Sequence, residues 1–313
     1  MKVDSMMRRA SALGNEQATH LLKVRNKALK RREEGLKKKR KKKKVMMGKK
    51  PVVSPALMKS VGSLGTGEVL VAEGDSWFDY PWNDILSLLE DEHGYDVESV
   101  ANKGDRVEEM AYIGGQLTNF VRRIEKLLRR GVIPKAILLS GGGNDVAGDD
   151  FHILLNHASS PNPGLNGDIL TGIIDHRIKY AYITILSAVT RICEERLGRK
   201  IRILTHGYDY PVPDGRGFWG GWLFLPGPWL EPGFREKGYE DMKARMAMTK
   251  KIIDRFNEML LDLSKLSMFS HVKHVDLRGT LPTGPTYKKW WDNELHPTEL
   301  GFSKVTAQFA QAI

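Results

Sequence analysis

The chain has 313 residues, of which 41% are hydrophobic, and it carries a formal net charge of +11. It is long enough for one large domain or two small ones, and no apolar run approaches the ~20 residues of a membrane-spanning helix. The N-terminus lacks the uninterrupted apolar stretch of a secretory signal, and the single cysteine, Cys193, excludes an internal disulfide. We therefore expect a cytoplasmic protein in which Cys193 fills the core.

The positive charge is concentrated in the first fifty residues, which hold 19 Lys and Arg against 4 Asp and Glu. The remaining residues hold 30 Lys and Arg against 34 Asp and Glu and are slightly acidic. Residues 37–44 are all Lys or Arg, and such blocks are usually solvated and disordered. We predict a flexible basic extension over residues 1–50, with a helix over part of residues 16–36 as the alternative. It either contacts nucleic acid or an anionic membrane surface, where the protein would be peripheral, or only increases solubility.

Residues 51–66 contain two prolines and two glycines and are predicted to be a linker. Beyond it, apolar runs typical of strands alternate with helical segments. Strands are predicted at residues 69–72, 96–100, 136–139, 201–204 and 271–275. Helices are predicted at residues 82–92, 106–130, 172–197, 236–266 and 298–312. Because this alternation indicates parallel pairing with right-handed crossovers, we expect residues 67–313 to form one α/β domain. Its predicted architecture is a three-layer α/β/α sandwich around a five-stranded, mainly parallel sheet.

Polar residues follow three of the predicted strands and precede the last helix. Gly74-Asp75-Ser76 follows the first strand, Gly104 the second and Gly142-Gly143-Asn144-Asp145 the third, and His296 lies near the C-terminus. The carboxyl ends of parallel strands are where α/β folds bind their ligands. A serine, a histidine and hydrogen-bond donors are the groups that acyl transfer through a tetrahedral oxyanion requires.

Together these four blocks resemble the SGNH (GDSL) hydrolases, a family of esterases and lipases. The family's blocks are Gly-Asp-Ser, a lone Gly, Gly-x-Asn-Asp and a late Asp-x-x-His; here the first three blocks and the histidine of the fourth occur in the same order over residues 66–313. The resemblance implies a flavodoxin-like sandwich and ester hydrolysis without a metal or organic cofactor.

The resemblance implies a role for each block. Ser76 is the expected nucleophile, and its backbone N–H, the N–H of Gly104 and the Asn144 side chain are the expected oxyanion hole. The alternatives are that Gly-Asp-Ser only caps a helix and that Gly104 is an ordinary turn glycine. Asp145 is expected to brace the loop that carries Asn144.

His296 is the expected general base, but its surroundings depart from the family pattern. The family's orienting acid lies three residues before the histidine, where this chain has Asn293, whereas Asp292 and Glu294 lie four and two residues before it. An amide accepts a hydrogen bond from imidazole but does not stabilise the imidazolium by charge. We predict Asp292 as the third catalytic residue; the alternatives are orientation by a backbone carbonyl and a slow enzyme.

Aromatic residues are dense between residues 206 and 232 and directly after Ser76. Trp219 and Trp222 lie in a loop that glycines and prolines interrupt, and we expect them, with Trp77 opposite, to form the apolar walls of a substrate pocket. A dimer contact or a small core under the loop is the alternative. Asp149 and Asp150 are expected to lie in a solvated loop rather than in a metal site.

These features predict a serine hydrolase that cleaves a carboxylic ester or thioester of a small molecule or lipid through an acyl-enzyme. Transfer of the acyl group to an acceptor other than water would use the same residues. A hypothesis from another class is a binding or tethering protein with a vestigial site, in which the basic tail engages nucleic acid or an anionic membrane.

Overall fold

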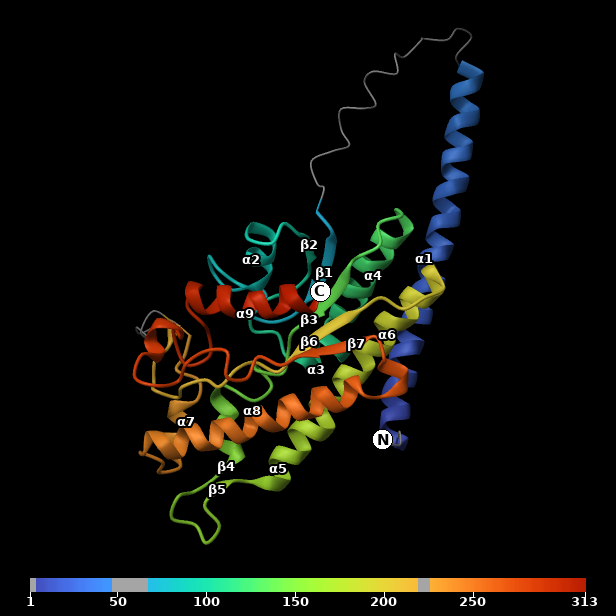
Figure 1. The fold of residues 1–313 in the computed structure, drawn as a ribbon. Coiled ribbons are helices and arrows are strands. Elements are labelled where there is room, and N and C mark those ends of the chain that lie inside the picture. Colours follow the sequence, from blue (N-terminus) through green and yellow to red (C-terminus); the bar gives the residue numbers. More distant parts are fainter. Residues whose placement is uncertain (1–3, 47–66, 219–225) are drawn as a thin grey trace.

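The computed structural model describes residues 4–46, 67–218 and 226–313, and its centre is a five-stranded sheet (Figure 1). All four strand pairings are parallel, in the order β2-β1-β3-β6-β7. The strands are β1 (Val69–Glu73), β2 (Asp96–Ser99), β3 (Ala136–Leu139), β6 (Ile203–His206) and β7 (Val272–Val275). The five predicted strands are therefore confirmed, with bounds that differ by at most two residues. A short antiparallel pair, β4 (Leu155–Asn156) and β5 (Gly164–Leu165), was not predicted.

Helices cover both faces of the sheet, which confirms the predicted α/β/α sandwich. One face carries α2 (Ile85–Asp91) and α9 (Glu299–Ala312), which lie side by side (Figure 1). The other carries α3 (Val107–Tyr112), α4 (Gln116–Arg129), α6 (Lys179–Leu197) and α8 (Met242–Ser264). A short helix α5 (Gly167–Thr171) and a π-helical segment (Gly172–Ile178) lead directly into α6.

Two helices predicted from the sequence are shorter in the structure, and glycines lie where they end or begin. Gly114 and Gly115 have φ angles of +65° and +76°, a conformation that L side chains rarely adopt, and they separate α3 from α4. The predicted helix over residues 236–266 is likewise preceded by a separate α7 (Glu231–Glu236), and Gly238 at φ +77° lies between α7 and α8.

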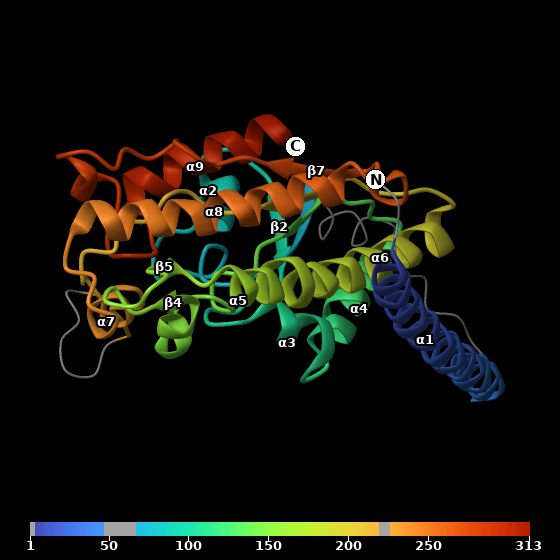
Figure 2. The same cartoon turned by 90° about the horizontal axis from the view of Figure 1, so that it is seen from below.

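The N-terminal segment is a helix whose first half packs on the domain, so the predicted flexible extension is wrong over residues 7–25. α1 (Ser5–Met46) runs along the outer side of α6, away from the sheet (Figures 1 and 2). A Cβ added at Gly14 would lie 2.1 Å from the backbone oxygen of Thr184, so the two helices touch through their backbones. The buried residues in the described part of α1 are Met7, Ala10, Ser11, Gly14, Ala18, Leu21 and Leu22. Sequence analysis missed this face because small residues form much of it.

Polar contacts fix α1 at two further points. The Thr184 hydroxyl lies 3.2 Å from the backbone oxygen of Ala10, and the Ser187 and Ser11 hydroxyls are 3.0 Å apart. Near the other end of the contact, the fully buried carboxylate of Glu125 accepts from Arg25 of α1 at 3.5 Å and from Arg196 of α6 at 2.9 Å. Covered by α1, α6 is buried on nearly all sides, and Cys193 is a buried core residue as expected.

Within the parts of the chain that the structure describes, no helix is long and apolar enough to cross a bilayer.

Candidate active site

The predicted nucleophile and base lie together at the carboxyl edge of the sheet. β1 ends at Glu73, and the turn that follows presents Ser76, which is half-buried. The Ser76 Oγ lies 2.6 Å from the Nε2 of His296, although the two residues are 220 positions apart in the chain. This is the hydrogen-bond distance that proton transfer from a serine to a base requires.

His296 is held by a loop that closes on itself just before α9. Trp291 and Pro297 form an isolated antiparallel bridge, and the backbone N–H of Asp292 donates to the His296 carbonyl at 2.9 Å. The indole N–H of Trp77 donates to the carbonyl of Leu295 at 3.1 Å, which joins this loop to the turn that carries Ser76. The loop therefore leaves the imidazole little freedom to move away from the hydroxyl.

Asn293, and not the predicted Asp292, contacts the second nitrogen of the imidazole. The Asn293 Oδ1 lies 3.0 Å from His296 Nδ1 and also accepts the backbone N–H groups of Leu295 and His296, both at 3.0 Å. Because this oxygen accepts only, the ring carries its proton on Nδ1 and leaves Nε2 free to accept from Ser76. The prediction of Asp292 as the third catalytic residue, in contact with the ring, is therefore wrong.

Asp292 instead contacts Asn293, and so reaches the ring only through that side chain. Its Oδ2 accepts from the Tyr80 hydroxyl at 2.9 Å and from the Asn293 Nδ2 at 3.2 Å, and Nδ2 also donates to the Tyr80 oxygen at 2.9 Å. These contacts fix which way the amide points, since a flipped amide would set its Nδ2 against the His296 N–H. Asp292 is therefore a positioning residue for Asn293.

Burial without a charged partner weakens the basicity of His296. The ring is 6% exposed, stacks on Tyr80 at 4.4 Å between centroids, and meets the edge of Trp229 at 5.5 Å. Desolvation of the charged form lowers the pKa of His296 to about 3. The ring is therefore neutral at pH 7, which is the form that accepts a proton.

Glu294, the other acid near His296, anchors a neighbouring loop. Its buried carboxylate accepts four backbone N–H groups, those of Gly215, Trp229, Leu230 and Glu231, at 2.7–3.0 Å. Burial nevertheless raises its pKa above the ordinary value. It ties the described part of the aromatic loop to the segment that carries His296.

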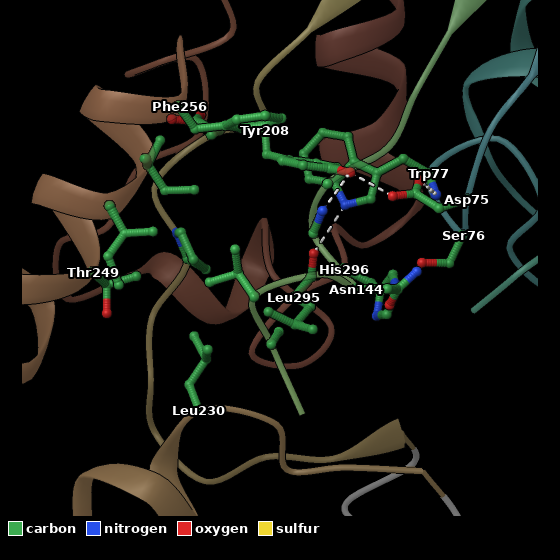
Figure 3. A pocket seen from close by; sticks show the side chains of 18 of the residues that line it. Asp75, Ser76, Trp77, Asn144, Tyr208, Leu230, Thr249, Phe256, Leu295 and His296 are labelled. Atoms are coloured by element: carbon green, nitrogen blue, oxygen red, sulfur yellow. Dashed lines mark hydrogen bonds between the residues drawn. The ribbon is translucent and has the colours of Figure 1, made fainter. Parts of the chain in front are cut away.

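Asn144 lies beside Ser76 and His296, as Figure 3 shows, whereas Gly104 does not line the cavity. The Asn144 Nδ2 donates one hydrogen to the carbonyl of Asp105 at 3.0 Å, which leaves its second hydrogen for a ligand. Gly104 has a φ of +88° and forms the turn that precedes Asp105. The carboxylate of Asp145 accepts from the first backbone N–H groups of α3, at 2.8 and 3.3 Å, as expected of a residue that braces this loop.

A buried network under Ser76 involves Tyr208, which sequence analysis did not assign to the site. The Tyr208 hydroxyl donates to the buried carboxylate of Asp75 and accepts from the N–H of Gly143 at 3.0 Å. Ser140 donates to the same carboxylate at 2.8 Å, and burial raises the pKa of Asp75. Tyr208 adopts a φ of +62°, which is uncommon and strained for an aromatic residue. Its position directly after β6 was the only signal in the sequence.

An apolar cavity of about 70 Å³ opens beside Ser76 and extends toward α8 (Figure 3). Trp77 lines it, as expected, and is 3% exposed. Trp219 and Trp222, predicted as the opposite wall, lie outside the described residues. The wall that the structure describes there belongs to α8, which sequence analysis read only as a helix. The lining residues are Asp75, Ser76, Trp77, Gly142, Gly143, Asn144, Val146, Ala147, Phe151, Tyr208, Asp209, Pro211, Leu230, Thr249, Ile252, Ile253, Phe256, Trp291, Leu295 and His296.

Among the described residues, no three His, Cys, Asp or Glu side chains converge as a metal site would require. Asp149 and Asp150 are exposed and begin a short 3₁₀ helix (Asp149–Leu154).

Comparison with known proteins supports the fold. No family model and no curated protein matches the chain. It is similar to the structure of a lipase from a goat rumen metagenome, with 14% identity, a TM-score of 0.50 and coverage of 78% of this chain and 97% of the lipase. The two proteins share the fold, a parallel sheet with helices on both faces. At this identity the likeness concerns the fold alone.

Two further structures match at lower scores. One is an aryl esterase from M. smegmatis, at 12% identity, TM-score 0.43, and coverage of 79% and 98% of the two chains. The other is described as an SGNH hydrolase from Slackia heliotrinireducens, at 12% identity, TM-score 0.41, and coverage of 78% and 98%.

Proposed function

We propose that the protein is a serine hydrolase that cleaves carboxylic esters or thioesters through an acyl-enzyme intermediate. The observation that carries this proposal is the 2.6 Å contact between Ser76 Oγ and His296 Nε2 at the mouth of an apolar cavity. A hydroxyl is a poor nucleophile alone and needs an adjacent base that is neutral at the working pH. Burial keeps His296 in that form.

In the first half of the reaction, Ser76 attacks the carbonyl carbon and its proton passes to His296 Nε2. The negative charge that develops on the carbonyl oxygen is stabilised by the free hydrogen of Asn144 Nδ2 and by the backbone N–H of Ser76. A single donor of this kind typically contributes about 3 kcal/mol to the stability of the transition state. When the tetrahedral intermediate collapses, His296 returns the proton to the leaving alcohol or thiol, and the acyl group stays on Ser76.

In the second half, a water molecule takes the place of the alcohol. His296 accepts a proton from this water while the water oxygen attacks the acyl carbon. The same donors stabilise the oxyanion. Collapse releases the carboxylic acid, and the proton on His296 returns to Ser76 Oγ. The scheme requires no metal and no organic cofactor.

Asn293 makes this a Ser-His-Asn arrangement. Its oxygen selects the required tautomer of His296 but contributes no negative charge to stabilise the imidazolium that forms in each step. The carboxylate of Asp292 stabilises the imidazolium more weakly, because Asn293 lies between the two groups. We therefore expect a working but slower enzyme than a matched Ser-His-Asp hydrolase.

The test is hydrolysis of p-nitrophenyl acetate by the full-length protein and by Ser76→Ala. Wild type should release p-nitrophenol above the uncatalysed rate, and the variant should lose at least about 10⁴-fold in kcat/KM. Ser264→Ala changes a half-buried serine at the end of α8 that does not line the cavity; it is the matched control and should be as active as wild type. Equal rates for Ser76→Ala and wild type would exclude the proposal.

The basic end of α1 supports a second function, attachment to nucleic acid. The buried contacts of α1 end near Leu29, residues 30–37 are all exposed, and the helix projects beyond the body of the domain (Figure 1). The sequence of residues 37–44 contains only Lys and Arg and no apolar residue, whereas helices that lie in a membrane surface need an apolar face.

The test replaces residues 37–44 by Gln and compares elution from immobilised duplex DNA along a salt gradient. Wild type should elute at clearly higher salt than the variant, because neutralised phosphates release counterions. Equal elution would contradict this function. Retention of the wild type on anionic vesicles but not on DNA would identify a membrane surface as the partner instead.

A further inference from the structure

The cavity beside Ser76 is closed on its far side by one face of α8. Thr249, Ile252, Ile253 and Phe256 line it, and their spacing places them on the same side of the helix. All four are at most 9% exposed, so the wall is packed into the core. The Thr249 hydroxyl donates to the carbonyl of Arg245 at 2.9 Å and does not need a partner in the cavity.

The other walls of the cavity are also apolar and well supported. Ala147 and Phe151, from the segment after β3, and Leu230, just before α7, also line it. Phe256 packs against the backbone of Gly142, where an added Cβ would come within 2.6 Å of its ring, and it stacks on Tyr208 at 5.8 Å. The side of the cavity next to the predicted oxyanion donors is therefore fixed by close contacts.

The size of the cavity limits what it accepts. A cavity of 150 Å³ lined by Leu, Ile and Phe holds one benzene, which has six carbon atoms. The cavity here has about half that volume, about 70 Å³, and so has room for about three carbon atoms. It begins at Ser76, where the carbonyl carbon of an ester would bind, so these three atoms are the ones that follow the carbonyl.

We propose that this cavity is the acyl-binding site, that it accepts straight chains of up to four carbons, and that Ile252 and its neighbours on α8 set this limit. The proposal rests on the function proposed above. Butyryl fills the site, because its three carbons beyond the carbonyl match the available volume. Each methylene that leaves water for an apolar site favours binding about fourfold. A longer chain has to displace the wall of α8 or stay in water.

The experiment compares kcat/KM for p-nitrophenyl esters from acetyl to decanoyl. For the wild type, kcat/KM should be highest with butyryl, about 15-fold above that with acetyl. With octanoyl it should be at least about tenfold lower than with butyryl. Ile252→Ala should move the optimum to hexanoyl or octanoyl. Ile252→Val, which is less disruptive to folding, should raise the ratio of hexanoyl to butyryl without moving the optimum as far.

Leu260→Ala is the matched control. Leu260 lies on the same helix and is 1% exposed, but it does not line the cavity. This variant should lose stability as Ile252→Ala does and keep the wild-type chain-length profile. A wild-type rate that increases through octanoyl, or the same profile for Ile252→Ala and Leu260→Ala, would overturn the acyl-site proposal alone. If no ester were hydrolysed, or if hydrolysis did not decrease in Ser76→Ala, the proposed function and this proposal would be overturned together.

Discussion

The catalytic edge of the sheet and the contact between α1 and α6 both join segments that are far apart in the chain, but different forces fix them. At the catalytic edge, Ser76, His296 and Asn293 meet through directional hydrogen bonds of 2.6–3.0 Å. At the α1–α6 contact, the decisive feature is the absence of a side chain at Gly14, which lets two helix backbones touch. The first region should therefore govern rate with little effect on stability, and the second should govern stability with little effect on rate.

The largest expected effect is at the catalytic edge. His296→Ala should lower kcat/KM by at least about 10⁴-fold, because Ser76 loses its base. Far-ultraviolet circular dichroism and ester hydrolysis, measured on the same sample, separate loss of chemistry from loss of fold. His20→Ala, an exposed histidine on α1, is the matched control and should have wild-type activity. A His296→Ala protein within tenfold of wild type would contradict the assignment of the base.

Asn144→Ala should lower kcat by about 10²- to 10³-fold, because the oxyanion loses a side-chain donor. We expect kcat to decrease and KM to stay unchanged. The reason is that the hydrogen bond from Asn144 forms only as charge develops on the carbonyl oxygen. Steady-state kinetics with p-nitrophenyl butyrate distinguish the two cases. An increase in KM with an unchanged kcat would assign Asn144 to ground-state binding instead.

Gly14→Ala tests the α1–α6 contact with the smallest possible side chain. The added Cβ would lie 2.1 Å from a backbone oxygen, so the free energy of unfolding should decrease by about 1–3 kcal/mol. Gly35→Ala lies in the same helix with nothing within 4 Å and should instead stabilise by up to about 1 kcal/mol. Urea denaturation gives both values, and kcat should be unchanged in both variants. Equal effects of the two substitutions would show that α1 does not pack on α6.

Exchanging the residues at 292 and 293 (Asp292→Asn with Asn293→Asp) tests how His296 is oriented. A carboxylate at position 293 should stabilise the imidazolium and raise kcat/KM at pH 8 at least about tenfold. It should also raise the pKa of His296, which burial lowers to about 3 in the wild type. His296 works as a base only when neutral, so activity is lost as the pH decreases through its pKa. Wild-type kcat/KM should therefore stay level well below pH 6.5, and that of the exchanged protein should decrease at a higher pH.

Asn293→Asp alone is the control for the exchange. It would place two carboxylates about as close as Asp292 Oδ2 and Asn293 Nδ2 are now, 3.2 Å apart, and one of them would take up a proton. The increase in kcat/KM should therefore be smaller for Asn293→Asp alone than for the protein with both residues exchanged. Identical pH profiles for wild type and the exchanged protein would contradict the role of Asn293.

The smallest expected effect is Glu73→Gln, at the end of β1. Burial raises the pKa of Glu73 to about 8, above its ordinary value of 4.5. The protonated folded form therefore adds stability below pH 4.5 that is lost as the pH increases through about 8. The free energy of unfolding of the wild type should decrease by about 1 kcal/mol more than that of the variant between pH 7.5 and 9. Parallel curves for the two proteins over this range would contradict the raised pKa.

The difference between the catalytic edge and the α1–α6 contact also explains which parts of the molecule could be predicted from the sequence. The five strands were predicted because buried parallel strands form continuous apolar runs. Ser76 and His296 were predicted because their short motifs resemble blocks of the SGNH hydrolases. Asp292 was a wrong prediction because one position in a tight turn decides which side chain faces the ring, and turn geometry is not encoded in the spacing alone. α1 was missed because Ala10, Gly14 and Ala18 resemble a weakly apolar pattern until their partner helix is known.

The wall of the acyl cavity was missed for a third reason. Ile252 and Phe256 are ordinary core residues of an amphipathic helix, and nothing in the sequence distinguishes a residue that lines a cavity from one that fills it. Tyr208 is similar, since its strained backbone conformation and its contact with Asp75 exist only in the folded chain.

The most direct test of the central claim is covalent labelling with a fluorophosphonate, followed by peptide mass mapping. If Ser76 is activated by His296, one equivalent of the probe should bind, it should be found on Ser76, and His296→Ala should label far more slowly. A probe found on another residue, or equal labelling of wild type and His296→Ala, would contradict the account.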